Sequence, residues 1–430
     1  MIAFVDRWGN NHKRYCNGLS INTDPEVLTK NEIQAGRVKC RAFADYTGCA
    51  GLWVGQVVLM SINLFQLILH SCGIGKVLKI FMIRKSSALL IVALLFSAAL
   101  SAPAPAVERD RVDRAIDRAL AFLKKTQESD GAWSGRTQKK RPAISSLAIM
   151  AFLSAGHVPG EGRYAALLDK GIRWVLKTQN RVGLFASDDN LDMYHHGIST
   201  LMLAEAAGMT DSKLGRELKP CLEKAVDVIL KAQRNGGSNN PQKGGWRYLA
   251  HGNDADISVS GWQILALRAA KNLGCDVPAE KINLALDYVR RCQDPVSGGF
   301  GYTPGGLVSG PCTGTSILAL ELCGKEHHGR EVLRGGSYLL KNPLNFGQQH
   351  FFYSVYYQSQ AMFQLGKNYW NVFRPQLHKV LLEQQTRHGS WNADDGLGAN
   401  YGTAMAVLAL TVEYRFLPIY QREEPQEKRK

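Results

Sequence analysis

The chain has 430 residues, a formal net charge of +15 and nine cysteines. Its length allows a sizeable buried core, and the cysteines form no CxxC pair, which excludes a zinc knuckle and argues against a regular disulfide framework. Basic residues do not interleave with aromatic ones, so we expect no nucleic-acid partner, while the positive charge allows weak association with a membrane surface.

The first part of the chain has the composition of an export signal. Residues 82–106 combine a basic start, an apolar run too short to span a bilayer and a small-residue end. We therefore expect an exported protein that begins at Met82, with residues 1–81 mistranslated upstream sequence or disordered. The alternative is a membrane segment over 52–70, which its polar residues make a poor spanning helix.

From residue 111 onwards, half-polar and apolar helices alternate. Apolar residues recur at helical spacing in 111–126, with charges between them, and a more apolar helix follows over 143–155. Gly and Pro residues end each unit. The same alternation predicts five further pairs, over 164–179 and 194–208, 218–233 and 257–273, 282–293 and 313–324, 332–340 and 351–366, and 370–385 and 401–414.

A short motif marks the end of the first helix of most pairs. It is a glutamine followed by a glycine turn and an aromatic residue, complete at 122–133. The glutamines are Gln127, Gln179, Gln233, Gln293 and Gln385, and one degenerate copy is expected at 338–341, with lysine in place of glutamine. Such self-similarity indicates a repeat architecture.

Six such pairs predict an all-α, (α/α)6 toroid over 107–414. Amphipathic helices can face water and form the outer ring, whereas helices that are apolar all round must lie inside. Residues 415–430 carry many charges and are expected to form a disordered tail.

The motif of 122–133 resembles the QW repeat of the squalene and terpenoid cyclases, and protein prenyltransferases share the same α-α toroid. The resemblance covers essentially all of 108–414. It implies that each glutamine ties neighbouring outer helices, that each tryptophan stacks on a helix end, and that both are structural.

Side chains that could carry chemistry lie where the inner helices begin, at the rim of the predicted ring. The candidate acids are Asp192, Asp254 and Asp256. The candidate ligand-binding residues are Tyr194, His195, His196, Ser258, Trp262, Cys312, Thr313, His350, Tyr353, Tyr356, Tyr357 and Tyr401. Asp, Ser and Thr are also the preferred helix N-caps, so a purely structural role is an alternative for several of them.

The resemblance implies an aspartic acid that protonates the substrate, within an Asp-x-Asp-Asp-Thr motif. This chain has Asp254, Asp256 and Ser258 in that region. Aligned from its start, the motif loses its third aspartate to Ile257. Aligned by the helix that follows, Asp256 takes the first position and Ser258 replaces the acid. We prefer the second alignment, which removes the proton donor.

Prenyltransferases hold zinc with Asp, Cys and His. Where the family has a histidine, this chain has Gly402, between Tyr401 and Thr403. We therefore expect no metal and no other cofactor.

Several functions remain open. The preferred one is an exported toroid that binds an isoprenoid or another elongated apolar ligand without the standard cyclase acid. A second is an active cyclase or prenyltransferase-type enzyme with Asp256 or Asp192 as the acid. Others are protein binding and a polysaccharide lyase or glycosidase, whose carboxylates would come from Asp188, Asp189, Asp192, Asp254 and Asp256. The sequence does not indicate an oligomeric state.

Overall fold

The computed structural model describes residues 2–5, 11–14, 111–137, 139–187, 189–210, 213–237, 239–393 and 396–421. The chain divides into two compact units, Met1–Glu108 and Arg109–Lys430. In the first unit, β1 (Ile2–Val5) and β2 (Asn11–Arg14) pair in antiparallel fashion, with Ile2 opposite Arg14. The predicted signal at 82–106 and residues 422–430 lie outside the described residues.

The second unit consists of helix pairs, as predicted. Its outer helices are α3 (Arg111–Thr126), α5 (Ala165–Lys177), α7 (Lys213–Ala232), α9 (Ala279–Arg291), α11 (Arg330–Lys341) and α13 (Lys367–Gln384). Its inner helices are α4 (Pro142–Ser154), α6 (Asp192–Gly208), α8 (Ile257–Asn272), α10 (Gly310–Cys323), α12 (Phe351–Gln364) and α14 (Gly398–Leu410). Short 3-10 turns lie at Gly162–Tyr164, Val412–Tyr414 and Pro418–Tyr420.

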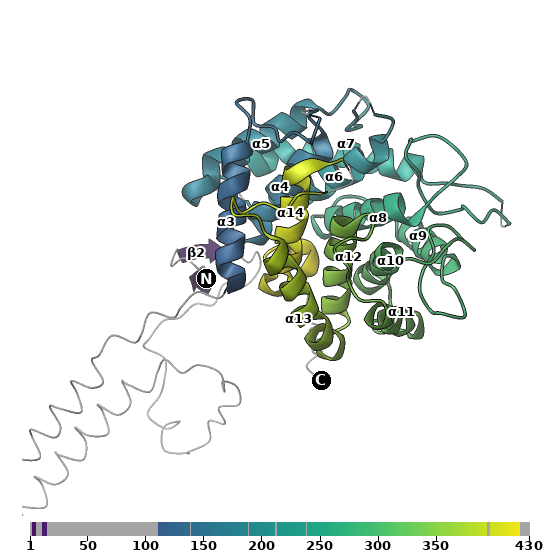
Figure 1. Ribbon diagram of the computed structural model, residues 1–430. Helices are drawn as coiled ribbons and strands as arrows, with labels where there is room; N and C mark the ends of the chain where they lie inside the picture. Colours follow the sequence, from purple (N-terminus) through teal and green to yellow (C-terminus); the bar gives the residue numbers. More distant parts are fainter. Residues whose placement is uncertain are drawn as a thin grey trace, which may run out of the picture. The chain divides into compact units, whose positions relative to one another are not determined.

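The inner helices form a closed ring. Each packs against the next in chain order, and α14 returns to pack against α4, so that these two lie side by side in Figure 1. Every residue of α4 is buried, whereas α3 buries only one stripe, which includes Ile116, Leu120 and Leu123. The closed inner ring with an outer helix for each member confirms the predicted (α/α)6 toroid. A helix that is apolar all round has to be buried, which explains why α4 lies in the inner ring.

The glutamines of the repeat tie neighbouring outer helices together. The Gln127 side-chain amide donates to the Gly131 carbonyl of its own turn and, at 3.0 Å, to the Leu167 carbonyl of α5. Gln179, Gln233 and Gln293 reach α7, α9 and α11 in the same way. Gln385 completes the circle by donating to Ala115 of α3 at 2.8 Å. The predicted role of these glutamines is confirmed.

The tryptophans of the repeat satisfy carbonyl groups at the ends of the outer helices. The indole N–H groups of Trp133, Trp246 and Trp391 each donate, at 2.8 Å, to a carbonyl of the preceding outer helix. These carbonyls lie in the last turns of the outer helices, where carbonyl groups lack the full set of helical partners, so the indole bonds help to cap the helix ends. The turn itself needs glycine: Gly183 has a φ of 98°, and a Cβ there would lie 2.7 Å from the Lys224 carbonyl oxygen.

The degenerate copy lacks the glutamine tie. In every other copy the glutamine lies five residues after the first residue of the motif, which places Pro343, not Lys341, at that position. Proline has no side-chain donor. Instead the Tyr369 hydroxyl of α13 donates to the Leu333 carbonyl of α11 at 3.2 Å, so a different bond joins these two outer helices.

The chain remains packed beyond the predicted boundary at 415. The turn Pro418–Tyr420 contacts α6 and α8, and Leu417, Ile419 and Tyr420 are buried. These apolar side chains make 415–421 part of the core, so the tail prediction is wrong for this segment. None of the helices in the described part of the chain is long and apolar enough to cross a membrane.

Candidate functional site

Asp256 lies at the start of α8, at the rim formed by the aromatic turns. Its side chain caps the helix by accepting from the Val259 N–H at 2.9 Å, and it accepts from the Ser258 hydroxyl at 2.6 Å. The second carboxylate oxygen accepts from Arg247 at 3.0 Å. The Asp256 side chain is fully buried, so these donors replace its lost hydration.

Arg247 connects the two predicted aspartates. Its guanidinium also contacts the exposed Asp254 carboxylate at 3.2 Å, and it lies over the rings of Tyr248 and Tyr302, 4.3 and 5.3 Å from their centroids. One guanidinium therefore contacts both carboxylates, and a second cation, Arg234, donates to the Asp254 backbone carbonyl at 2.8 Å. The aromatic rings hold the guanidinium by cation–π contacts.

Opposing effects act on the Asp256 carboxyl. Burial is the largest effect and raises the pKa of Asp256 above its usual value, although the hydrogen bonds from Ser258 and Val259 and the charge of Arg247 oppose it. Both oxygens accept hydrogen bonds, one of them from a cation, so neither oxygen points freely into the site. A proton donor to a substrate would need a free O–H pointing into the site.

Three inner helices meet around Ser258. The Tyr194 hydroxyl of α6 hydrogen-bonds to the Ser258 hydroxyl, and the Tyr353 hydroxyl of α12 donates to the Ser258 carbonyl at 2.8 Å. Tyr194 also stacks on Tyr248, with ring centroids 5.8 Å apart. Both tyrosines keep part of their surface accessible, although burial raises the pKa of each hydroxyl well above its usual value.

An aromatic layer lies deeper in the ring. Trp262 stacks on Tyr356 at 5.2 Å and meets Tyr357 edge-on at 5.1 Å. The Tyr420 hydroxyl, which comes from the C-terminal turn, lies 3.2 Å from that of Tyr356. These side chains are buried, whereas Tyr194 and Tyr353 of the rim are partly accessible. The Trp262 indole N–H has no partner among the described residues.

A second polar cluster lies at the start of α6. His195 Nε2 is 2.9 Å from one oxygen of Asp189, and Arg141 Nε is 2.9 Å from the other. The hydrogen bond from His195 lowers the pKa of the Asp189 carboxyl. His195 Nδ1 is buried and has no hydrogen-bond partner in the described structure.

Two predicted ligand-binding residues are part of the scaffold. The backbone N–H of Phe185 donates to His196 Nδ1 at 3.2 Å, and His196 Nε2 bonds the Ala225 carbonyl at 3.0 Å. Burial lowers the pKa of His196 to about 4, so it is neutral at pH 7. Thr313 accepts from the Phe300 N–H at 2.9 Å. The His196 ring nitrogens and the Thr313 hydroxyl are therefore all engaged in hydrogen bonds to backbone atoms of the protein.

A repeated pattern explains these two contacts. The aromatic residue of each turn donates its N–H to a side chain near the start of the next inner helix. The same bond joins Trp133 to Ser145, Trp246 to Ser260 and Trp391 to Thr403. Ser145, His196, Ser260, Thr313 and Thr403 thus play the same role, although they follow the aromatic residue at varying separations of 11 to 14 residues.

The remaining predicted residues lie near the starts of other inner helices. Asp192 is half-buried in the first turn of α6. Cys312 is buried near the start of α10, where burial raises its thiol pKa to about 11. His350 is exposed, with a left-handed φ of 57° before α12, and Tyr401 is buried in α14. Asp188 lies outside the described residues.

Sequence reasoning missed the cation at the centre of the rim. Arg247 and Tyr248 directly follow Trp246, and Tyr302 follows Phe300 by two residues. Polar and aromatic residues that closely follow the aromatic residue of a turn are therefore a signal from which this cluster could have been predicted. Among the described residues, no group of three or more His, Cys, Asp or Glu side chains is placed to hold a metal ion.

Compared by sequence, the chain matches no family model and no curated protein. Its fold is similar to that of the GH76A alpha-1,6-mannanase from Salegentibacter sp. HEL1_6, with a TM-score of 0.55 and 12% identity over 71% of this chain and 100% of the mannanase chain. It is also similar to the type II terpene cyclase MstE from Scytonema, with a TM-score of 0.50 and 15% identity over 71% of this chain and 99% of the cyclase chain.

A third similar structure is a glycosidase in complex with glucose, with a TM-score of 0.51 and 12% identity over 74% of this chain and 100% of that chain. The chain is therefore an α-α toroid, of the fold class in which a terpene cyclase and carbohydrate-active enzymes both occur. Identities this low show the fold alone, and the chemistry depends on the site.

Proposed function

We propose that this toroid binds an uncharged, largely apolar ligand of the isoprenoid type at its rim, without acid-initiated chemistry. The observation that carries the proposal is the cluster of partly accessible tyrosines at the rim, which are Tyr194, Tyr248, Tyr302 and Tyr353. Their hydroxyl groups already bond to protein atoms or to one another, so the rings are what they offer to a ligand.

The cations that contact this group are already bound to protein atoms. Arg247 contacts the Asp254 and Asp256 carboxylates, and the Arg234 guanidinium donates to the Asp254 backbone carbonyl at 2.8 Å. A phosphate or diphosphate group would have to compete with these partners, which argues against a prenyltransferase-type substrate. The buried layer of Trp262, Tyr356 and Tyr420 fills the interior, so the ligand would lie across the rim and not along the ring axis.

An active cyclase with Asp256 as its acid is less well supported. The Asp256 oxygens are occupied by Ser258, Val259 and Arg247, so protonating an alkene would first require breaking this network. Asp192 as the acid remains an alternative. Incubation with squalene tests both residues: a cyclised product that disappears in Asp256→Asn or Asp192→Asn would establish the enzyme.

Carbohydrate binding is a second candidate, favoured by one observation. Asp254 and Asp256 contact the same guanidinium, at 3.2 and 3.0 Å, which places them within the separation of up to about 10 Å that glycosidases use. However, Arg247 occupies the space between them, where a sugar or water would have to lie. The geometry therefore suits sugar binding better than hydrolysis.

The export signal at 82–106 extends the proposal to location. We infer an exported protein that could also associate weakly with a membrane surface, as its positive charge suggests. Detection of a mature N-terminus near residue 107 in a cell-free or periplasmic fraction would support export. A fragment from upstream of Met82 in the natural protein would contradict the start at that methionine.

The binding test compares ligands and variants. Farnesol, squalene and alpha-1,6-mannotriose are titrated separately into the full chain while tryptophan fluorescence is followed. We expect saturable binding of farnesol or squalene that Tyr248→Ala weakens about tenfold or more, through lost aromatic contact. The matched control is Tyr369→Ala, another half-buried tyrosine but on α13, which should bind normally. Binding of mannotriose alone would replace the proposal by its carbohydrate alternative.

A further inference from the structure

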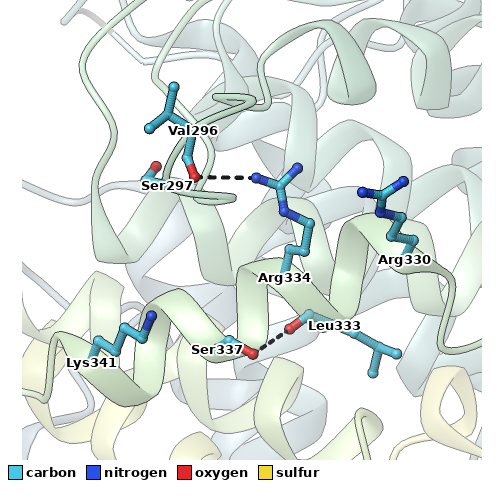
Figure 2. Close-up of a pocket in the computed structure, with 7 residues that line it drawn as sticks. All are labelled: Val296, Ser297, Arg330, Leu333, Arg334, Ser337 and Lys341. Atoms are coloured by element: carbon cyan, nitrogen blue, oxygen red, sulfur yellow. Dashed lines mark hydrogen bonds between the residues drawn. The ribbon is translucent and has the colours of Figure 1, made fainter.

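A basic groove runs along the outside of the ring, on α11. It is about 540 Å³ in volume and lies between α11 and the loop after α9 (Figure 2). Its lining residues are Val296, Ser297, Arg330, Leu333, Arg334, Ser337 and Lys341. Three of them are cations and none is acidic, so the groove offers positive charge to a ligand.

The lining residues from α11 form one continuous stripe. Positions 330, 334, 337 and 341 are separated by four, three and four residues, which places them on the same face of an α-helix, and position 333 lies beside this stripe, three residues after 330. Arg330 and Lys341 are eleven residues apart, or about 16 Å along the helix axis. The cations are therefore spread along the groove and do not converge on one point.

The opposite wall is fixed by Arg334 itself. Its guanidinium donates to the carbonyl of Pro295. It also donates, at 3.2 Å, to the carbonyl of Val296 (Figure 2). Asp294 holds the same loop by accepting from the Ser297 N–H at 2.7 Å and from its hydroxyl at 2.6 Å. Two independent sets of hydrogen bonds thus keep the wall in place before any ligand binds.

The other cations of the groove are not neutralised by the protein. Arg330 and Lys341 are exposed, and neither forms an ion pair within the described part of the chain. Glu331, the nearest acid on α11, instead contacts Arg290 of α9 at 3.1 Å. An anionic ligand would therefore meet two unpaired cations at the ends of the groove and Arg334 between them.

We propose that this groove binds a linear acidic polysaccharide, whose sulfate or carboxylate groups contact Arg330, Arg334 and Lys341 in turn. Cations spread along one helix face suit an extended strand, which can contact them in turn. The lining contains no aromatic residue on which a nucleic-acid base could stack. The hydroxyl groups of Ser297 and Ser337 can accept hydrogen bonds from sugar hydroxyls.

The test measures binding of a dextran sulfate oligosaccharide to the full chain at low and at physiological salt. The double variant Arg330→Gln, Lys341→Gln should bind about tenfold more weakly or worse, because each lost contact is worth up to about a factor of five. The control is Lys124→Gln, Lys125→Gln, which removes the same charge from exposed lysines at the end of α3. It should bind within about twofold of the wild type.

Several results would overturn this proposal. Equal losses in the two double variants would show general charge attraction without a site. Binding of neutral dextran with the same affinity would remove the role of the anions. Groove-dependent binding that is tighter for single-stranded DNA, or for phosphatidylcholine vesicles containing phosphatidylserine, would assign another partner. Tyr248→Ala should leave dextran sulfate binding unchanged, so failure of the rim proposal and failure of this one are distinguishable.

Discussion

Glu205 is a carboxyl group buried in the ring without a cation, and its replacement by glutamine gives the sharpest stability prediction. Glu205 lies on α6 and is 1% exposed. Its two oxygens lie 3.2 and 3.3 Å from the Ile419 backbone nitrogen of the C-terminal turn. Desolvation raises its pKa from 4.5 to about 8, and the bond from Ile419 only partly opposes this.

The sign of the pH effect follows from the raised pKa. Between pH 4.5 and about 8 the folded protein holds a proton on Glu205 that the unfolded chain releases, so stability falls as pH rises. The loss amounts to about 3 kcal/mol at pH 7 and approaches about 5 kcal/mol above pH 8. Glutamine resembles the protonated acid and avoids this loss.

Urea unfolding at pH 5, 7 and 9 measures the difference between wild type and Glu205→Gln. We expect similar stabilities at pH 5 and a more stable variant at pH 9, by several kcal/mol. Local release of the C-terminal turn would limit the global loss, and faster hydrogen exchange of the Ile419 amide would then report it. The control Glu383→Gln changes an exposed residue of α13 and should show no such trend. If the stability gain of Glu205→Gln does not grow with pH, by either readout, the reasoning is refuted.

Three further substitutions test the ring and its rim. Gln293→Leu should lower the free energy of unfolding by about 1–3 kcal/mol, because the Glu331 and Gly298 carbonyls lose their donor. An unchanged free energy in urea unfolding would contradict the tie between α9 and α11. Trp391→Phe should cost about 1–3 kcal/mol by the same assay, through the lost bond to Leu381, and an unchanged midpoint would remove this capping role. Asp256→Ala should lower the free energy of unfolding by about 1–3 kcal/mol, because α8 loses its N-cap and Arg247 loses its buried partner. Neither this variant nor the wild type should cyclise squalene.

The ring could be predicted from sequence because its rules are local. Five of the six outer-helix ends carry their own glutamine, glycine turn and aromatic residue, and the inner helices are much more apolar than the outer ones, so spacing and periodicity predict the fold. The glutamine ties could be inferred for the same reason. The failure at 415–421 has a different cause: the charged end of the chain hid the short apolar stretch around Ile419 and Tyr420, which packs into the core.

The rim was harder to predict because distant segments build it. Asp256, Ser258, Tyr194 and Tyr353 were all candidates, and the structure brings them together through hydrogen bonds across three helices. Arg247 was missed because its partners become visible only when the turn and helix fold against each other. His196 was misread because a histidine at a helix start resembles a ligand, although here it takes the place that serine or threonine fills in other repeats.

The central claim is that the rim holds an uncharged apolar molecule. Mass spectrometry of small molecules extracted from the natural protein, purified without detergent, tests it most directly. The account predicts a neutral isoprenoid or similar hydrocarbon in near-stoichiometric amount, reduced in Tyr248→Ala and unchanged in Tyr369→Ala. A bound sugar, a charged lipid or no bound molecule at all would contradict it.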